Sequence, residues 1–265
     1  MIEELQQNVH AQPPLVTLKN VQKVFQSGGK DFVAVKDVTL TIEAGDLLSI
    51  VGPSGCGKTT VLKILAGLYD ASGGSVQIGP EGAGSVAGHD VGMVFQQPLL
   101  LKWRSIIDNV LLPADILGLP RKEVRERAHD LLAMVGLKDA ADKYPYQLSG
   151  GMQQRAAIAR ALIHDPKLVL MDEPFGALDA ITREKMNLEL LRIREQSNKT
   201  FIVVTHGIQE AVFLGSHCAV LSAGPARMAD YFAIDIDYPR PLSVKTSPKF
   251  GAYVERIYDK LDMSA

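Results

Sequence analysis

Two kinds of hydrophobic pattern alternate along the chain: short apolar runs rich in β-branched residues, and longer runs with helical spacing. The short runs predict strands at residues 16–25, 33–42, 46–51, 91–95, 168–171 and 201–205. The last two are continuously apolar, which is typical of parallel strands buried on both faces of a sheet. Residues 180–197, between them, have a helical pattern, and this strand–helix–strand unit predicts an α/β core.

The first two predicted strands are separated by turn-forming residues at 27–29, so they predict an antiparallel β edge. A long stretch without strand character follows, from residue 98 to about 166. Apolar residues recur there at helical spacing, at Val124, Ala128, Leu131, Leu132 and Val135. A further helix is predicted at 151–163, ending before Pro166. The α/β core therefore carries a helical insertion.

Residues 250–261 predict an amphipathic helix near the C-terminus. Its apolar positions are Phe250, Tyr253, Val254, Ile257, Tyr258 and Leu261. Such a helix packs on its own domain or contacts a partner, and the pattern leaves both interpretations open.

Composition narrows the class of protein. The 265 residues carry a formal net charge of -2, so no basic excess is present to bind nucleic acid. Two cysteines do not form a disulfide framework and fit a reducing compartment. No run of 18 apolar residues occurs, and the first twelve residues lack the pattern of a signal peptide. We expect any link to a membrane to come through a partner.

Residues 52–59, GPSGCGKT, match the phosphate-binding loop pattern between a predicted strand and a helix predicted at 59–68. Glycines let successive backbone N–H groups turn inward, and the following helix presents its positive end to an anion. We expect Lys58 to reach the β- and γ-phosphates of a nucleoside triphosphate and the Thr59 hydroxyl to ligate Mg²⁺. The residues predicted to bind the nucleotide here are Gly52, Pro53, Ser54, Gly55, Cys56, Gly57, Lys58, Thr59 and Thr60.

Cys56 lies near a helix N-terminus and Lys58, and these conditions favour the thiolate. We therefore expect alkylation of this thiol to inhibit hydrolysis of the nucleoside triphosphate, and bound MgATP to protect Cys56 from alkylation.

Two carboxylates, Asp172 and Glu173, follow the apolar strand at 168–171. Ligands of parallel sheets bind at the carboxyl ends of strands, where the phosphate loop also lies. We assign Asp172 to Mg²⁺ and Glu173 to the water that attacks the γ-phosphate. A solvated acidic turn is the alternative. His206 follows the strand at 201–205, and we expect it to contact the γ-phosphate.

Residues 148–155, LSGGMQQR, open a helix with a Ser149 cap and two glycines, a further backbone cradle for phosphate. This segment resembles the signature motif of ABC ATPases, and with the phosphate loop the resemblance extends over roughly residues 16–223. It implies a P-loop NTPase core with an antiparallel β subdomain and an inserted helical subdomain. The implied domains are a tail at 1–14, an ATPase domain at 15–226 and a C-terminal extension at 227–265.

The resemblance also assigns residues. It implies that Gln96 is the glutamine-loop residue near Mg²⁺, that His206 is the switch histidine, and that adenine stacks on Phe25, for which a core position is the alternative. Residues implied to contact the ATP of the other subunit are Ser149, Gly150, Gly151, Gln154 and Asp179.

In such a family, ATP lies between the phosphate loop of one subunit and the signature motif of another, so two copies form two composite sites. The implied partners are a second ATPase subunit as a homodimer, transmembrane permease subunits and, indirectly, a solute-binding protein. The implied location is the cytoplasmic face of the cell membrane.

Residues 97–103, QPLLLKW, carry several apolar side chains after the glutamine loop. They either pack within the insertion or form a groove for a permease helix, with Trp103 as an anchor. The segment resembles the corresponding stretch in the ATPase subunits of importers of nitrate, sulfonates and taurine, although Lys102 replaces a proline there. Elsewhere, Gly207 stands after the switch histidine, where the broader family usually has an acid.

Three functions are compared: an import ATPase, a soluble ABC-type ATPase acting on ribosomes or DNA, and a nucleotide-binding regulator without turnover. The second class usually has two cassettes or coiled-coil arms, and neither pattern is found here. Glu173 and His206 argue against the third.

Overall fold

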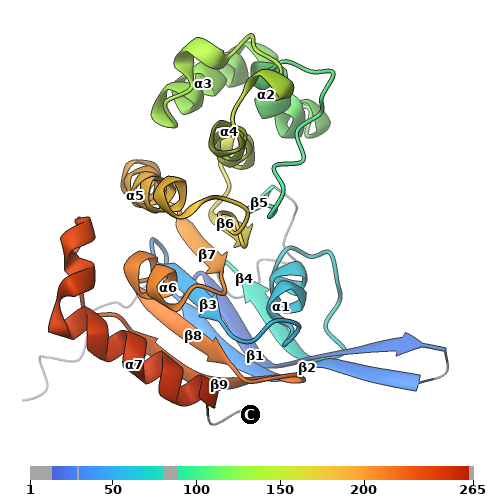
Figure 1. Ribbon diagram of the computed structural model, residues 1–265. Coiled ribbons are helices and arrows are strands. Elements are labelled where there is room, and N and C mark those ends of the chain that lie inside the picture. Colours follow the sequence, from blue (N-terminus) through green and yellow to red (C-terminus); the bar gives the residue numbers. More distant parts are fainter. Residues whose placement is uncertain (1–13, 29, 80–88, 263–265) are drawn as a thin grey trace, which may run out of the picture.

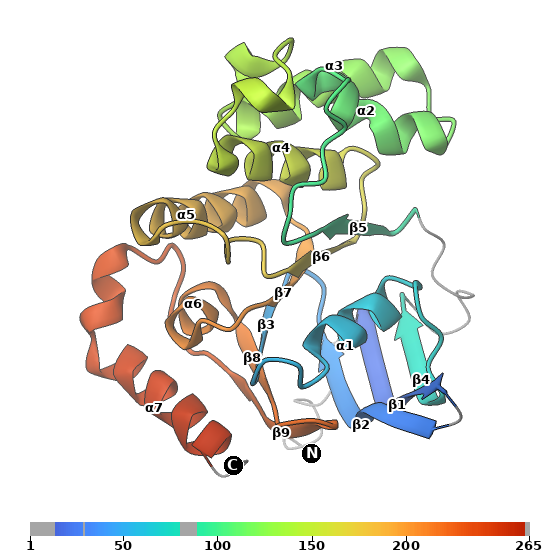
Figure 2. The same cartoon turned by 45° about the vertical axis from the view of Figure 1, so that its right-hand side comes forward.

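The computed structural model describes residues 14–28, 30–79 and 89–262. In this part of the chain, nine strands form one mixed sheet in the order β4-β1-β2-β9-β8-β3-β7-β6-β5 (Figures 1 and 2). The strands are β1 (Val16–Ser27), β2 (Lys30–Ile42), β3 (Leu47–Val51), β4 (Gly73–Ile78), β5 (Val91–Val94), β6 (Leu168–Asp172), β7 (Thr200–Val204), β8 (His217–Leu221) and β9 (Ala226–Ala233).

The centre of the sheet is parallel. β5, β6, β7, β3 and β8 pair in parallel, and every residue of β3 and β7 is buried. Continuous burial explains why these strands have no polar alternation, and it confirms the predicted α/β core. β6 and β7 end in register, with Asp172 opposite Val204.

The opposite edge is antiparallel, as predicted: β1 pairs with β2 on one side and with β4 on the other. β4 was not predicted, because Gly73 and Gly74 read as a turn. It forms because β1 offers it a free edge, with Val16 opposite Ile78. A Cβ on Gly74 would lie 2.3 Å from the Asn20 carbonyl oxygen, so this close approach requires glycine.

Helices cover both faces of the sheet. Their bounds are α1 (Lys58–Leu65), α2 (Ile106–Ile116), α3 (Arg121–Met134), α4 (Gly150–Leu162), α5 (Ala180–Ser197), α6 (Ile208–Leu214) and α7 (Pro248–Asp262). α1 packs with β1 and β2 in one hydrophobic cluster, whereas α2 to α7 belong to another. Alternate residues of β3 enter the two clusters, Leu47 in one and Leu48 in the other, so the two cores lie on opposite faces.

The predicted helical insertion is confirmed by α2, α3 and α4, which gather beyond the β5–β6 edge in Figures 1 and 2. α2 was not predicted, and it contains Pro113. None of the helices in the described residues is both long and apolar enough to cross a membrane.

The C-terminal segment is joined closely to the sheet. β9 begins at residue 226, where we expected the domain to end, and pairs with both β2 and β8. α7 lies along α6 on the outside of the molecule (Figures 1 and 2), and its Phe250 and Ile257 are buried. Of the two interpretations of this helix, the structure shows packing on its own domain.

Arg240 fastens this segment to α6. Its guanidinium is only 2% exposed and stacks 4.0 Å from the centroid of the Tyr238 ring. Nη1 donates to the carbonyls of Val212, Phe213 and Gly215, each at 2.9 Å. One side chain therefore caps the last carbonyls of α6, which have no partner within the helix.

Replacing Arg240 by Ala is expected to lower the free energy of unfolding by about 3 kcal/mol, because several buried carbonyls lose a charged donor. Urea unfolding followed by circular dichroism would measure this change. Lys249→Ala is the matched control, since its ion pair with Asp235 is exposed and should contribute nothing measurable. Equal stability of Arg240→Ala and the parent would contradict the anchoring role.

Candidate functional site

The phosphate loop joins β3 to α1 through two glycines in the left-handed region. Gly55 has φ 75° and Gly57 has φ 118°, and Gly57 is the N-cap of α1. A Cβ on Gly57 would lie 2.7 Å from the Ala34 carbonyl oxygen. Both the backbone angle and the close contact therefore require glycine, and the loop presents backbone N–H groups ahead of a helix N-terminus.

Lys58 is buried inside this loop, with 5% of its surface exposed. Its Nζ donates to the carbonyls of Gly52 at 2.8 Å and Pro53 at 2.9 Å. A buried ammonium held by two neutral oxygens has no carboxylate partner in these contacts. It can therefore supply positive charge to an anion in the loop.

Thr59 and Asp172 meet where β6 ends beside α1. The Thr59 hydroxyl donates to Asp172 Oδ1 at 3.0 Å. Burial, chiefly, raises the pKa of the Asp172 carboxyl. Two oxygens side by side, one on a carboxylate whose charge is incompletely compensated, fit a hard cation such as Mg²⁺. Within the described residues, no group of three or more His, Cys, Asp or Glu side chains could hold a metal alone, so further oxygen ligands would be needed.

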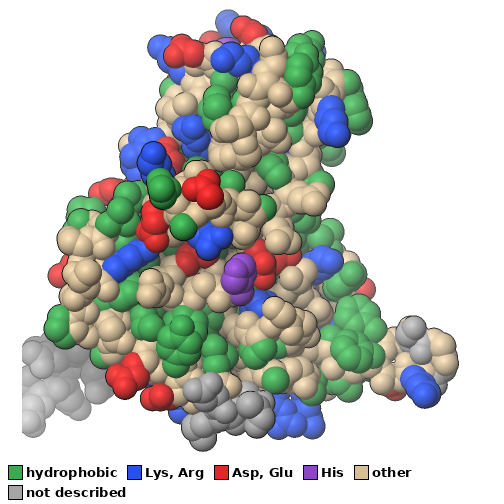
Figure 3. Space-filling view, viewed as in Figure 1, with side chains coloured by type: hydrophobic (Ala, Val, Ile, Leu, Met, Phe, Trp, Pro, Cys, Tyr) green, Lys and Arg blue, Asp and Glu red, His purple; other side chains and the backbone are tan. Residues whose placement is uncertain are grey.

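Glu173 and His206 face each other across the ends of β6 and β7. Glu173 Oε2 lies 3.3 Å from His206 Nδ1, and the two side chains are 26% and 53% exposed. Glu173 has φ 45°, an uncommon conformation for a residue with a Cβ, and its N–H donates to Val204 O at 2.9 Å. This contact holds the turn that points the carboxylate toward His206. Figure 3 shows acidic, basic and histidine side chains gathered between the sheet and the helical part.

Gln96, directly after β5, reaches the same place. A Cβ on Gly176 would lie 3.5 Å from both Gln96 Nε2 and Glu173 Oε2. The amide and the carboxylate therefore converge on one glycine. Asp172 ends β6 and Glu173 follows it, while His206 and Gln96 lie two residues after the adjacent strands β7 and β5. The strand pattern predicts this edge for Asp172, Glu173 and His206, and the resemblance adds Gln96.

The signature segment forms a separate surface. Ser149 caps α4 and accepts from Met152 N–H at 3.4 Å, and Gly150 is exposed. Asp179 caps α5 and accepts from Thr182 N–H at 3.0 Å. A Cβ on Gly151 would lie 3.3 Å from Thr182 Cγ2, so the two caps are neighbours. Figures 1 and 2 place α4 away from α1, and the two halves of the expected composite site are apart within one chain.

Gln154 does not belong to that surface. It is 2% exposed, and its Nε2 donates to the Phe95 carbonyl at 3.2 Å inside its own chain. The expectation that Gln154 contacts a partner's nucleotide is therefore wrong. Its position on the fifth residue of α4 turns the side chain toward the core, while Ser149 and Gly150 precede that turn.

Phe25 is half-buried near the open end of β1. Its ring makes an edge-to-face contact with Tyr69 at 5.4 Å, and Lys23 Nζ lies 5.2 Å from the ring centroid. Tyr69 was missed by the sequence analysis, because it lies in the turn after α1 rather than in a motif. The partly open ring remains available for stacking with a base.

Cys56 departs from its expected chemistry. It is 1% exposed, and burial raises the pKa of its thiol in spite of the nearby Lys58 charge. The expected thiolate character is therefore wrong. The sequence places Cys56 in the phosphate loop but does not show that its side chain is buried beneath that loop.

An apolar groove lies beside the glutamine loop, on the helical part. This groove has a volume of about 410 Å³, and we call it the insertion groove. It is lined by Val91, Met93, Phe95, Leu99, Leu112, Pro113, Ile116, Leu117, Arg160, Ala161 and His164. Leu99 and Ile116, which line the groove, are 55% and 75% exposed, and Trp103, four residues after Leu99 in the chain, is 75% exposed. Exposed apolar side chains around a groove indicate a surface for a partner.

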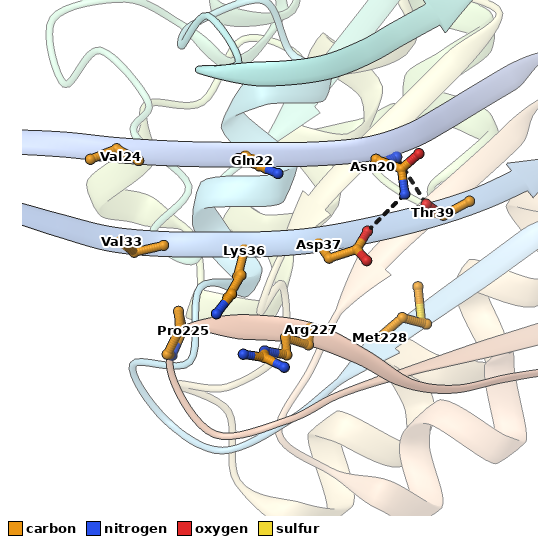
Figure 4. A pocket seen from close by; sticks show the side chains of 10 residues that line it. All are labelled: Asn20, Gln22, Val24, Val33, Lys36, Asp37, Thr39, Pro225, Arg227 and Met228. Atoms are coloured by element: carbon orange, nitrogen blue, oxygen red, sulfur yellow. Dashed lines mark hydrogen bonds between the residues drawn. The ribbon is translucent and has the colours of Figure 1, made fainter.

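Another hollow, about 980 Å³, lies on β1, β2 and β9 (Figure 4). Its lining includes Asn20, Asp37, Lys36 and Arg227 but no residue of the phosphate loop. It lies where β2 and β9 pair over only two residue pairs. The chemistry described above lies outside it.

Comparison with known proteins agrees with this geometry. A family model described as ABC transporter matches residues 35–176. The chain is 44% identical over 245 residues to an uncharacterized ABC transporter ATP-binding protein of Methanocaldococcus jannaschii, covering 92% of this chain and 90% of that protein. It is 41% identical over 244 residues to the taurine import ATP-binding protein TauB of Escherichia coli (strain K12), covering 88% and 92%.

A solved structure has the same fold. The dimeric, post-hydrolysis state of the ATP-binding cassette MJ0796, bound to ADP and Pi, has a TM-score of 0.72 and 36% identity to this chain. The match covers 84% of this chain and 100% of that one.

Because both cysteines are buried, their reactivity toward a thiol reagent can be tested in the native and the unfolded protein. Cys56 and Cys218 should react with a soluble disulfide reagent only when the protein is unfolded, because 1% and 0% of their surfaces are exposed. Absorbance of the released thiol, with and without urea, would measure this. A Cys56→Ser variant reports Cys218 alone. Rapid labelling of native Cys56 that MgATP prevents would contradict the buried position.

Proposed function

The chain belongs to the ABC transporter ATP-binding family, and we propose that it binds and hydrolyses ATP to energise an importer of taurine or a related small organic anion. ATP hydrolysis follows from the family, the matched cassette structure and the phosphate loop. The single observation that carries the assignment of residues is the convergence of Lys58, Thr59, Asp172, Glu173 and His206 on one edge of the sheet.

Binding of the triphosphate is assigned to the phosphate loop. Backbone N–H groups from Ser54 to Thr60 surround the β- and γ-phosphates, and Lys58 neutralises part of their charge. Thr59 and Asp172 would hold Mg²⁺ together with phosphate oxygens and water, and Gln96 is assigned to the same ion. The ion would supply charge neutralisation at the phosphates. Phe25, supported by Tyr69, is assigned to the adenine.

Hydrolysis is assigned to the pair Glu173 and His206. Glu173 Oε2 accepts a hydrogen bond from the attacking water and orients it in line with the γ-phosphate. His206 lies 3.3 Å from that carboxylate and is placed to donate to a γ-phosphate oxygen as charge develops. The positive φ of Glu173 keeps the carboxylate at the strand end rather than along α5.

A second copy completes the site. Ser149, Gly150, Gly151 and Asp179 lie on an exposed surface away from the phosphate loop of their own chain, so we assign them to the nucleotide of a symmetry-related partner. The dimeric state of the matched cassette MJ0796 supports this arrangement. ATP then joins the two copies, and its hydrolysis releases them.

The substrate class rests on the similarity to the taurine import protein, since the solute is selected by other subunits. We assign the insertion groove, which Ile116 lines, to a helix of the transmembrane permease, and we assign exposed Trp103 to the same contact as a further anchor. This docking would place the chain at the cytoplasmic face of the membrane. A partner on a ribosome or on DNA is disfavoured by the net charge of -2.

Glu173→Gln should bind ATP as the parent does, accumulate as an ATP-bound dimer, and lose kcat by more than about a hundredfold, because the amide cannot polarise water. Size-exclusion chromatography and phosphate release would measure both effects. Glu255→Gln, on exposed α7, is the control. Turnover of Glu173→Gln at the parent rate would refute the role of this carboxylate.

Trp103→Ala combined with Ile116→Ser should weaken assembly with the permease by roughly tenfold, because apolar anchors in a groove dominate such contacts. Co-purification of the membrane subunits with the tagged chain would measure assembly, and ATP binding should be unchanged. Tyr258→Ala removes another exposed aromatic, 54% exposed on α7, and serves as control. Undiminished assembly of the double variant would move the docking surface elsewhere.

A further inference from the structure

A second carboxylate lies behind the candidate catalytic pair. Glu210 is the third residue of α6, four positions after His206; the residue is half-buried, and its Oε1 atom is buried with no hydrogen-bond partner among the described residues. Burial, chiefly, raises the pKa of this carboxyl. A carboxyl oxygen that is buried without a hydrogen-bond partner is costly and needs a reason to be there.

Glu210 is the end of a short chain of hydrogen bonds. The Thr205 hydroxyl donates to Glu210 Oε2. The same hydroxyl oxygen accepts from the Gly207 N–H at 3.0 Å. Thr205 is 2% exposed, so water does not compete for these contacts. The chain of bonds therefore runs around His206, from the residue before it to the residue after it.

Gly207 provides the space for this arrangement. A Cβ at this position would lie 3.3 Å from Glu210 Cβ and 3.4 Å from Glu210 Oε2. A side chain here would press on the carboxylate that fixes the turn. Because Gly207 has φ -87°, in the extended region, its backbone angle does not require glycine, but a side chain here would have to displace the Glu210 side chain by a few tenths of an ångström.

Charged groups from neighbouring elements face the same carboxylate. Arg183 of α5, His206 and Lys245 all act to lower its pKa, against the effect of burial. Arg183 also donates to the carbonyls of Phe175 at 3.3 Å and Leu178 at 2.8 Å, in the segment that leads to Asp179. Lys245 pairs with Glu184 of α5. The carboxylate is thus held between the two segments that carry Asp179 and His206.

We propose that Glu210 is a positioning residue for hydrolysis: through Thr205 it fixes the 205–207 turn and so sets where the His206 ring stands relative to Glu173. The proposal rests on the function assigned to His206 above. Glu210 does not touch the nucleotide. Its effect is on the geometry of the 3.3 Å contact between His206 Nδ1 and Glu173 Oε2. Small displacements of such groups slow reactions without changing ground-state binding.

The matched pair Thr205→Val and Thr205→Ser tests the idea in the full chain. Valine has the shape of threonine but lacks the hydroxyl, whereas serine keeps it. Thr205→Val should lower kcat by roughly tenfold to a hundredfold and leave KM for ATP unchanged, and Thr205→Ser should retain the parent kcat. Glu210→Ala should behave like Thr205→Val, while Glu210→Gln, which keeps an acceptor oxygen, should retain most of the rate.

A spectroscopic measurement separates positioning from damage to the fold. The ¹⁵N imidazole signals of His206, identified by their loss in His206→Ala, should shift in Thr205→Val and Glu210→Ala and stay in place in Thr205→Ser. Parent kcat in Thr205→Val, or a loss of kcat with an equal loss of ATP affinity, would overturn the proposal. Parent kcat in His206→Ala would instead overturn the function assigned to His206.

Discussion

Three adjacent parallel strands, β3, β7 and β6, must open at the same edge of the sheet, because parallel pairing in register brings their carboxyl ends together. The phosphate loop follows β3, His206 follows β7, and the two carboxylates follow β6. The strands are buried on both faces, so their ends cannot shift without opening two hydrophobic cores. This constraint allows side chains far apart in sequence to meet within hydrogen-bond distance, as Thr59 and Asp172 do.

The same constraint limits what one chain can do. The sheet edge carries the residues that we assign to phosphate and to the attacking water, but the signature cap lies on the helical part, which rises beyond β5 and β6. A nucleotide on the phosphate loop therefore has an open side. In the arrangement proposed above, a second copy presents Ser149 and Asp179 to that open side, and the contact between the copies depends on the nucleotide between them. In such an arrangement, hydrolysis of the nucleotide would separate the two copies. A site complete within one chain would not link hydrolysis to separation.

Sequence was sufficient where a pattern and a backbone requirement coincide. The buried strands have uninterrupted apolar runs, and the phosphate loop needs glycine at Gly57 for both its angle and its contact with Ala34. Sequence patterns were not sufficient where contacts with other parts of the chain determine the local structure. β4 begins with two glycines and forms because β1 offers an edge. α2 was missed because it contains Pro113, which is unusual inside a helix. Its N-cap Ser105, which accepts from Asp108 N–H, was a signal that could have revealed the helix. Cys56 and Gln154 were placed correctly in their motifs, but the direction of each side chain, inward in both cases, depends on packing.

The C-terminal extension looks separable in sequence, yet its contacts make it part of the catalytic framework. α6 begins directly after His206 and Gly207, so any freedom of this helix is transmitted to the turn that carries the histidine. Arg240 holds the C-terminal carbonyls of α6, while Lys245 lies 4.6 Å from the Phe213 ring and pairs with Glu184 on α5. Glu210 holds the other end of the same helix through Thr205. A helix of seven residues is too short to be stable by itself. Its position is therefore set by these contacts at both ends, and the extension supplies the contacts at one of them.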